Sequence, residues 1–166
     1  ISAPFLFSGY YHRPEATAQV LQGGRYRTRD LGFLHEGELY VLGRKDDLLI
    51  SNGRNYFAHE IEQIANHVEG AKAGRNVAVG LLNADIGSDE IYLVQEAPDL
   101  GPTESKALRR QVRDAVQEQL SLALRDVVLV PAGWLVKTTS GKISREANKT
   151  KLAGELAARK AAAHRA

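Results

Sequence analysis

One lysine of this chain lies in a segment whose composition suits the binding of an anion. Residues 137–143 read Lys-Thr-Thr-Ser-Gly-Lys-Ile, so Lys142 follows a Ser-Gly pair and has hydroxyl and backbone donors around it. Such donors together suit a phosphate or a carboxylate. A Walker phosphate loop is excluded, because Ile143 follows the lysine and Val136 stands where the first glycine belongs. The alternative is a solvated lysine in a turn.

A second segment places an acid beside basic residues. Residues 26–32 read Tyr-Arg-Thr-Arg-Asp-Leu-Gly, so Asp30 lies at the start of an apolar stretch. A carboxylate in this position can accept hydrogen bonds from a sugar diol, as carboxylates do in nucleotide sites. The alternative is an ion pair of Asp30 with Arg27 or Arg29 at a strand end, which would contribute little stability.

A third segment concentrates charge between two predicted strands. It begins Gly-Arg-Lys-Asp-Asp at residues 43–47 and continues through the turn Ser-Asn-Gly at residues 51–53. Short charged segments at the ends of elements can act as hinges, because they absorb changes of φ and ψ without loss of core packing. We therefore weigh a flexible joint against an ordinary charged turn.

The composition argues against several other classes of function. The net charge of +2 is too small to indicate a nucleic-acid partner, and no apolar run approaches the roughly 20 residues that cross a bilayer. The absence of cysteine excludes disulfides and thiol chemistry and fits a cytoplasmic protein. The segment Ile1–Phe5 lacks the pattern of a signal peptide, and we expect the chain to be part of a longer protein.

Metal chemistry is also not expected from this sequence. His59-Glu60 resembles the start of a zinc-protease helix, but Gln63 stands where the second histidine belongs. The other histidines are scattered without ligand spacing. No residue is therefore assigned to a metal.

The periodicity of apolar residues predicts an α+β fold. Short extended pieces fill the first 45 residues, including a strand, a polar turn and a strand over residues 33–42. Further strands are expected at residues 48–50, 76–82, 90–96 and 127–130. Helices are expected from Ala58, with Glu60, Glu62 and Gln63 opposite its apolar face, from Pro102 with Thr103 as N-cap, and at the basic end. This order indicates a small mixed sheet of about three strands flanked by helices and preceded by a β-hairpin region.

Taken in order, these segments resemble the C-terminal part of the adenylate-forming superfamily, which activates acyl, aryl and amino acids. Residues 26–31 resemble the family's Y-R-T-G-D-L, and residues 137–143 its K-T-x-S-G-K-I. The hinge motif G-R-x-D…G-x-x…E-I-E is matched from Gly43 to Glu62. Residues 9–17 resemble the G-Y-x-x-R-P-E-x-T found just upstream.

The resemblance implies a two-step reaction and a role for each matched residue. ATP and a carboxylic acid give an acyl-adenylate and pyrophosphate; the small C-terminal domain then rotates, and a phosphopantetheine thiol takes the acyl group. Asp30 and Arg44 would hold the ribose hydroxyls, Asp46 would be the hinge, and Lys142 would reach the carboxylate and the α-phosphate. The thiol tunnel would be lined by Ser51, Asn52 and Gly53. ATP and Mg²⁺ are the implied cofactors, both bound mainly by a large N-terminal domain.

Within the superfamily, Gly53-Arg54-Asn55-Tyr56 and the segment 32–39 look most like fatty acyl-AMP ligases, which transfer the acyl group to an acyl carrier protein. An acyl-CoA ligase is the alternative. The chain departs from the family at Arg29, where the motif has glycine, and at Val136, which replaces a common proline. Arg29 would crowd the ribose and favours a second alternative, a non-catalytic interaction module that retains the fold.

The resemblance also predicts the domain organisation. Residues 1–45 would be the end of the large adenylation domain with its linker, and residues 46–166 the mobile C-terminal lid. Because the acyl pocket and the phosphate-binding loop of the large domain lie outside this sequence, we expect the chain alone to be inactive. The partners implied are the large domain, a carboxylic acid and a carrier protein or coenzyme A, with neither nucleic acid nor membrane.

Overall fold

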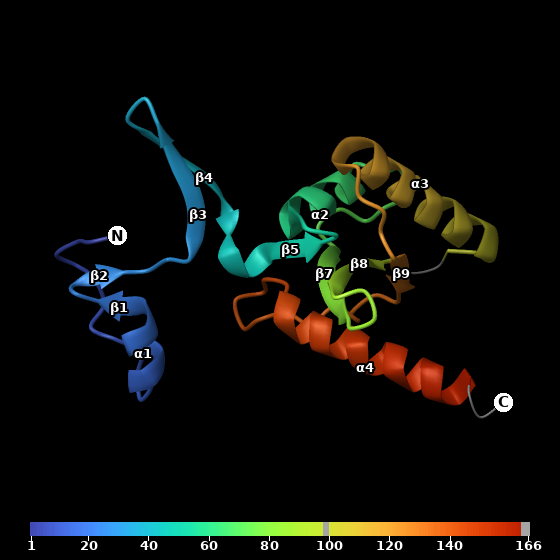
Figure 1. The fold of residues 1–166 in the computed structure, drawn as a ribbon. Coiled ribbons are helices and arrows are strands. Elements are labelled where there is room, and N and C mark those ends of the chain that lie inside the picture. Colours follow the sequence, from blue (N-terminus) through green and yellow to red (C-terminus); the bar gives the residue numbers. More distant parts are fainter. Residues whose placement is uncertain (98–99, 164–166) are drawn as a thin grey trace. The chain divides into compact units, whose positions relative to one another are not determined.

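The computed structural model describes residues 1–97 and 100–163 and consists of two compact units (Figure 1). The first unit is Ile1–Asp46 and the second is Asp47–Ala166. A short 3₁₀ helix, η1 (Lys45–Asp47), contains the boundary between them.

The first unit is built from one short helix and two small antiparallel pairs of strands. Its elements are α1 (Pro14–Val20), β1 (Leu21–Gln22), β2 (Arg25–Tyr26), β3 (Asp30–His35) and β4 (Glu38–Arg44). The expectation of extended pieces alone was wrong for residues 14–20, where Pro14 occupies the first turn of a helix, a position in which its missing N–H costs no hydrogen bond.

The hairpin of β3 and β4 has a two-residue turn and one irregularity in its register. Glu36 and Gly37 both have positive φ, 51° and 84°, as a type I′ turn requires. The register shifts between Leu31 and Gly32, and a Cβ on Gly32 would collide with the carbonyl oxygen of Tyr40. Glycine at position 32 therefore allows the close backbone approach in this hairpin.

The second unit has a three-stranded mixed sheet with helices on both faces. Strand β8 (Ser88–Glu96) is central, antiparallel to β7 (Asn76–Asn83) and parallel to β9 (Asp126–Val130). The helices are α2 (Ala58–Asn66), α3 (Pro102–Leu120) and α4 (Arg145–Ala163). A separate hairpin joins β5 (Leu48–Ser51) to β6 (Arg54–Phe57). The predicted α+β class, with its sheet of three strands, is confirmed.

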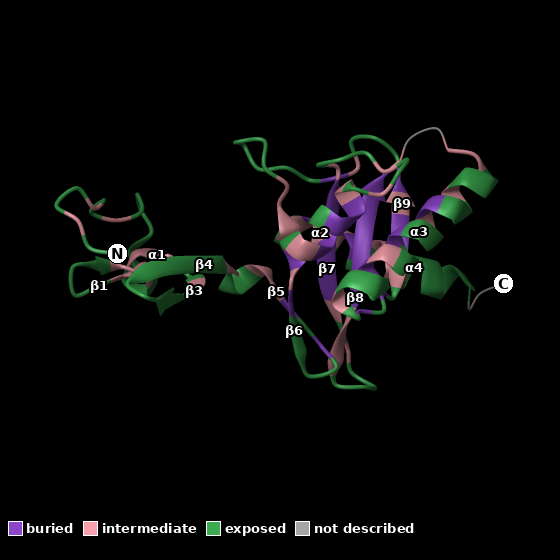
Figure 2. Ribbon diagram, turned by 90° about the horizontal axis from the view of Figure 1, so that it is seen from above, coloured by how far each residue is buried: buried purple, intermediate pink, exposed green. Residues whose placement is uncertain are grey.

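Alternation along the strands divides the core of the second unit into two clusters. Ala78, Ile91 and Leu93 pack with buried residues of α2 and α3. Val77, Val79 and Val94 face the other way and pack with Leu152 of α4. Figure 2 shows the resulting buried sheet between helices whose outer faces are exposed. None of the helices in the described residues is long and apolar enough to cross a membrane.

The start of α3 differs from the prediction. Pro102 is its first residue and Gly101 the N-cap, so Thr103 is not the cap. The free amide of Gly101 donates instead to Glu104 Oε2 at 2.8 Å. Proline is favoured in the first turn, and the glutamate supplies the acceptor that a capping hydroxyl would otherwise provide.

We predict that Leu93→Ala lowers the free energy of unfolding by about 2–5 kcal/mol, because it leaves a cavity around a fully buried side chain in the central strand. Leu82→Ala is the matched control, since Leu82 is 72% exposed, and should change stability by less than about 0.5 kcal/mol. Urea unfolding of both variants measures the difference; equal losses would contradict the assignment of the core.

Candidate functional site

The predicted catalytic lysine lies in a closed hairpin, residues 136–144, which we call the lysine loop. Lys137 and Ile143 form an antiparallel bridge, and Ser144 N donates to Val136 O at 3.0 Å. Thr138 N donates to Lys142 O at 2.7 Å, and Gly141 has a φ of 80° at the turn. The backbone on both sides of Lys142 is therefore fixed, while its side chain is exposed.

Two buried polar side chains anchor the base of the lysine loop. Asn148 of α4 accepts from Val136 N at 2.9 Å and donates to Val136 O and Ser144 O at 2.9 and 2.7 Å. Glu96, at the end of β8, is 2% exposed and accepts from Gly133 N and Leu135 N at 2.9 and 3.1 Å. Because buried polar groups are costly when unpaired, these bonds fix the loop to the sheet and to α4.

A half-buried arginine, Arg145, follows Lys142 by three residues and joins four segments of the second unit. Arg145 Nε donates to Asp47 Oδ1 at 2.9 Å, and Arg145 NH1 donates to Ala78 O at 2.7 Å and to Glu62 Oε1. Glu62 Oε1 also accepts from Ala78 N at 2.9 Å. We call Arg145, Glu62 and Asp47 the arginine cluster. It connects α4, α2, β7 and the first residue of the second unit.

Electrostatics keep Arg145 charged in this cluster. Burial by itself would lower the pKa of Arg145, but the hydrogen bonds and negative charges of Glu62 and then Asp47 outweigh burial and raise the pKa above its ordinary value. Glu62 was expected on the solvent face of α2. That expectation was wrong, because the carboxylate turns inward to pair with Arg145 and Ala78 N.

The predicted hinge residue, Asp46, belongs to the first unit. It forms an ion pair with Arg29 at 2.5 Å, and both side chains are 55% exposed. Lys45 N also donates to Arg29 O at 2.8 Å. The two neighbouring acids thus have different partners, since Asp46 pairs with Arg29 and Asp47 with Arg145. Asp46 is not part of a core.

The two residues predicted to hold a ribose are brought together by the β3–β4 register. Asp30 and Arg44 are paired across the hairpin, and Arg44 Nε lies 3.6 Å from Asp30 Oδ1. The Asp30 amide donates to Thr28 Oγ1 at 3.1 Å. The ion-pair partner of Asp30 is therefore Arg44, and the alternative of a pair with Arg27 or Arg29 is wrong.

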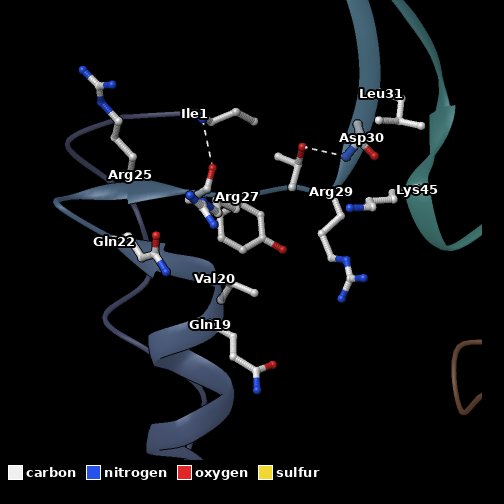
Figure 3. Close-up of a pocket in the computed structure, with 12 residues that line it drawn as sticks. Ile1, Gln19, Val20, Gln22, Arg25, Arg27, Arg29, Asp30, Leu31 and Lys45 are labelled. Atoms are coloured by element: carbon white, nitrogen blue, oxygen red, sulfur yellow. Dashed lines mark hydrogen bonds between the residues drawn. The ribbon is translucent and has the colours of Figure 1, made fainter.

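A hollow of about 770 Å³ in the first unit has Asp30 on its lining (Figure 3). Four cations also line it: Arg25, Arg27, Arg29 and Lys45. The excess of positive charge suits an anionic ligand, and the single carboxylate offers an acceptor for hydroxyl groups. Arg29 has a left-handed backbone conformation, with a φ of 64°. Glycine adopts this conformation without strain, so the glycine that the family motif has at this position suits the backbone.

The three residues predicted to line a thiol tunnel lie at the β5–β6 turn: Ser51 ends β5, and Asn52 and Gly53 form the turn itself. Asn52 and Gly53 have φ values of 50° and 73°, as an Asn-Gly type I′ turn requires. Ser51 is buried, while Asn52 and Gly53 are exposed. The predicted site residues thus fall on both units: Asp30, Arg44 and Asp46 on the first, and the turn and Lys142 on the second.

Among residues 1–97 and 100–163, no group of three or more histidine, cysteine or acidic side chains is arranged to hold a metal ion. The structure adds residues that the motifs did not single out: Arg145, Asn148 and Glu96. Arg145 lies two residues after the lysine motif, but a charged residue in a basic helix gives no signal of burial. Asn148 and Glu96 are polar at positions that periodicity places in a core, which was the available signal.

Comparison with known proteins gives the family. No family model matches the chain. The long-chain-fatty-acid–AMP ligase FadD26 of Mycobacterium tuberculosis is 34% identical over 157 residues, which cover 84% of this chain and 26% of that protein. A structure from work on fatty acyl-adenylate ligases of E. coli and L. pneumophila has a TM-score of 0.78 and 28% identity, covering 95% of this chain and 28% of that one. ATP-bound MatB from Rhodopseudomonas palustris has a TM-score of 0.66 and 28% identity, with 87% and 28% covered.

The chain therefore belongs to the adenylate-forming ligases. It spans about a quarter of the length of the curated relatives it matches, 26% for FadD26.

We predict that Arg145→Ala destabilises the protein by about 3–5 kcal/mol, because Glu62 and Asp47 lose their cation in a largely buried position. Arg159→Ala is the control, since Arg159 is 66% exposed and pairs only with Glu155 of its own helix in the described ion pairs. Chemical denaturation of both variants gives the comparison. A loss for Arg145→Ala no larger than the control's would show that the arginine cluster does not hold these segments together.

A second prediction concerns the strained backbone at Arg29. Arg29→Gly should be more stable than Arg29→Ala by about 1 kcal/mol, because both variants lose the ion pair with Asp46 and only glycine adopts the φ of 64° without strain. Thermal unfolding of the two variants measures this difference directly. Equal stability, or a more stable alanine variant, would mean that residue 29 is not left-handed in solution.

Proposed function

We propose that the chain is the C-terminal part of an ATP-dependent fatty-acid ligase. The parent enzyme joins a fatty acid to AMP, releases pyrophosphate, and then transfers the acyl group to a phosphopantetheine thiol. The carrying observation is the lysine loop, which presents an exposed ammonium group on a backbone held by buried side chains. The identity with an AMP ligase of fatty acids supports the substrate class.

The first step needs a cation between two anions. The oxygen of the fatty-acid carboxylate attacks the α-phosphorus of ATP, and the bond to the pyrophosphate oxygen breaks. Carboxylate and phosphate repel each other until positive charge lies between them, and Lys142 supplies one such charge. Mg²⁺, which we assign mainly to the large domain, neutralises further charge on the phosphates. Donors held in place before the reaction are effective because they need no reorganisation as charge develops.

The first unit supplies the nucleotide contacts in this proposal. Asp30 accepts hydrogen bonds from the ribose hydroxyls, Arg44 lies beside it across the hairpin, and the cationic hollow lies on the same segment. We assign residues 1–45 to the end of the large adenylation domain and its linker. Residues from 46 onward form the lid, and Asp46 is the hinge. Because ATP is a substrate in this proposal, we favour a cytoplasmic location.

The second step needs access for a thiol. The thiolate attacks the acyl carbonyl carbon of the adenylate, and AMP leaves. Lys142 must withdraw to admit the thiol, and the exposed β5–β6 turn replaces it along the phosphopantetheine arm. An acyl carrier protein is the acceptor that we favour, because Gly53-Arg54-Asn55-Tyr56 resembles the fatty acyl-AMP ligases. Coenzyme A is the alternative acceptor.

A non-catalytic interaction module is the second candidate, and Arg29 is the observation that favours it. The arginine side chain lines the hollow beside Asp30, where the family's glycine would leave more room for a nucleotide. Retention of Lys142, Asp30 and Arg44 together supports the enzyme instead, because a binding module has no physical need for all three.

We predict that Lys142→Ala in the intact enzyme lowers the rate of fatty-acid-dependent exchange of pyrophosphate into ATP by about 10²–10³-fold, the usual effect of removing a placed donor. Lys106→Ala is the control, because Lys106 is exposed on α3 and lies outside every predicted contact with substrate. Wild-type exchange by the Lys142 variant would refute the assigned role. Absence of exchange in the wild-type enzyme, across fatty acids, would favour the non-catalytic module.

A further inference from the structure

Two hairpins of the second unit meet at one hydrogen bond. The backbone amide of Asn52, in the β5–β6 turn, donates to Ser88 Oγ at 2.8 Å across 36 residues of sequence. Ser88 is the first residue of β8 and pairs with Asn83 at the tip of the β7–β8 hairpin. Neither the sequence motifs nor the proposed function gave Ser88 a part.

The backbone amide of Asn52 needs a hydrogen-bond acceptor from outside its own hairpin. In a two-residue hairpin the ladder bonds join Ser51 and Arg54, which flank the turn, and the amide of Asn52 points out of the ladder. An amide in that position bonds to water or to a side chain from elsewhere. Here the acceptor is Ser88, so the turn is tied to a second element and does not project freely.

Ser88 connects the β5–β6 turn to the buried sheet. It is half-buried, and the strand that it starts runs directly into the buried centre of the sheet at Ile91 and Leu93. The other end of the turn's hairpin is held as well, because Leu49 and Tyr56 belong to the core. The hydrogen bond therefore fixes the tip of a hairpin whose base is already fixed.

We propose that Ser88 is a positioning residue for the thiol-transfer step, holding the Ser51-Asn52-Gly53 turn where the phosphopantetheine arm passes. This inference rests on the proposed function. A phosphopantetheine arm carries two amide groups, and the thiol at its end must reach the acyl carbonyl within reacting distance. A small displacement of a lining turn changes how often that distance is reached, whereas adenylation does not use the turn.

The test measures the two half-reactions of the full-length enzyme separately. Ser88→Ala should raise the KM for free phosphopantetheine by about 3–10-fold, the range expected for one lost hydrogen bond. Its pyrophosphate exchange, measured with the fatty acid that the wild type uses best, should stay within about 2-fold. Ser88→Thr retains a hydroxyl and should restore the KM. Ser105→Ala, the same substitution on α3, is the matched control and should change neither half-reaction.

A second measurement reports on the contact without catalysis. Backbone hydrogen exchange of the segment 48–57 should be faster in Ser88→Ala than in the wild type, and unchanged in Ser105→Ala. If Ser88→Ala has the wild-type KM for phosphopantetheine and the wild-type rate of backbone hydrogen exchange in segment 48–57, this inference alone is overturned. A wild-type enzyme that exchanges pyrophosphate but acylates no thiol would overturn the proposed transfer step, and this inference with it.

Discussion

The placement of the lysine loop depends on one half-buried guanidinium group. Arg145 pairs with Glu62 and Asp47 and donates to the carbonyl of Ala78, so α4, α2, β7 and the first residue of the second unit are bound to a single cation. A cation with two carboxylates is stable away from water only when its hydrogen bonds are satisfied, and here they are. Because Lys142 precedes Arg145 by three residues, the same cation determines where the loop enters α4.

The lysine loop combines a fixed base with an exposed tip. Asn148 bonds both ends of the loop, at Val136 and Ser144, and Glu96 holds the segment just before it. The ammonium group of Lys142 remains in solvent. Electrostatic stabilisation of a transition state is strongest when the charge is positioned in advance, and the mobile lid that we propose needs to carry its charge on a rigid support. This arrangement suits both requirements.

The elements with strong periodicity were predictable from the sequence, and the pairings between them were not. Alternation and helical spacing predicted the strands and the helix at Ala58. The ordered motifs singled out Lys142, Asp30 and Arg44, whose roles stay predictions. Nothing in the sequence indicated that Glu62 turns inward, because its position on a helical wheel is polar and its partner, Arg145, is 83 residues away. Likewise, the sequence shows Ser88 only as a serine in a polar segment, and its contact with Asn52 follows from the fold. The left-handed backbone at Arg29 explains why glycine suits that position, and the spacing of the motifs could not have predicted this conformation.

The role of Lys142 can be tested with a crystal structure of the intact enzyme bound to the fatty acid and to an ATP analogue whose α,β bridge blocks reaction. We predict that the Lys142 ammonium nitrogen lies within about 3 Å of both a carboxylate oxygen and an α-phosphate oxygen, the distance of a charge-assisted hydrogen bond. A complex with both ligands bound and a different cation between them would contradict it.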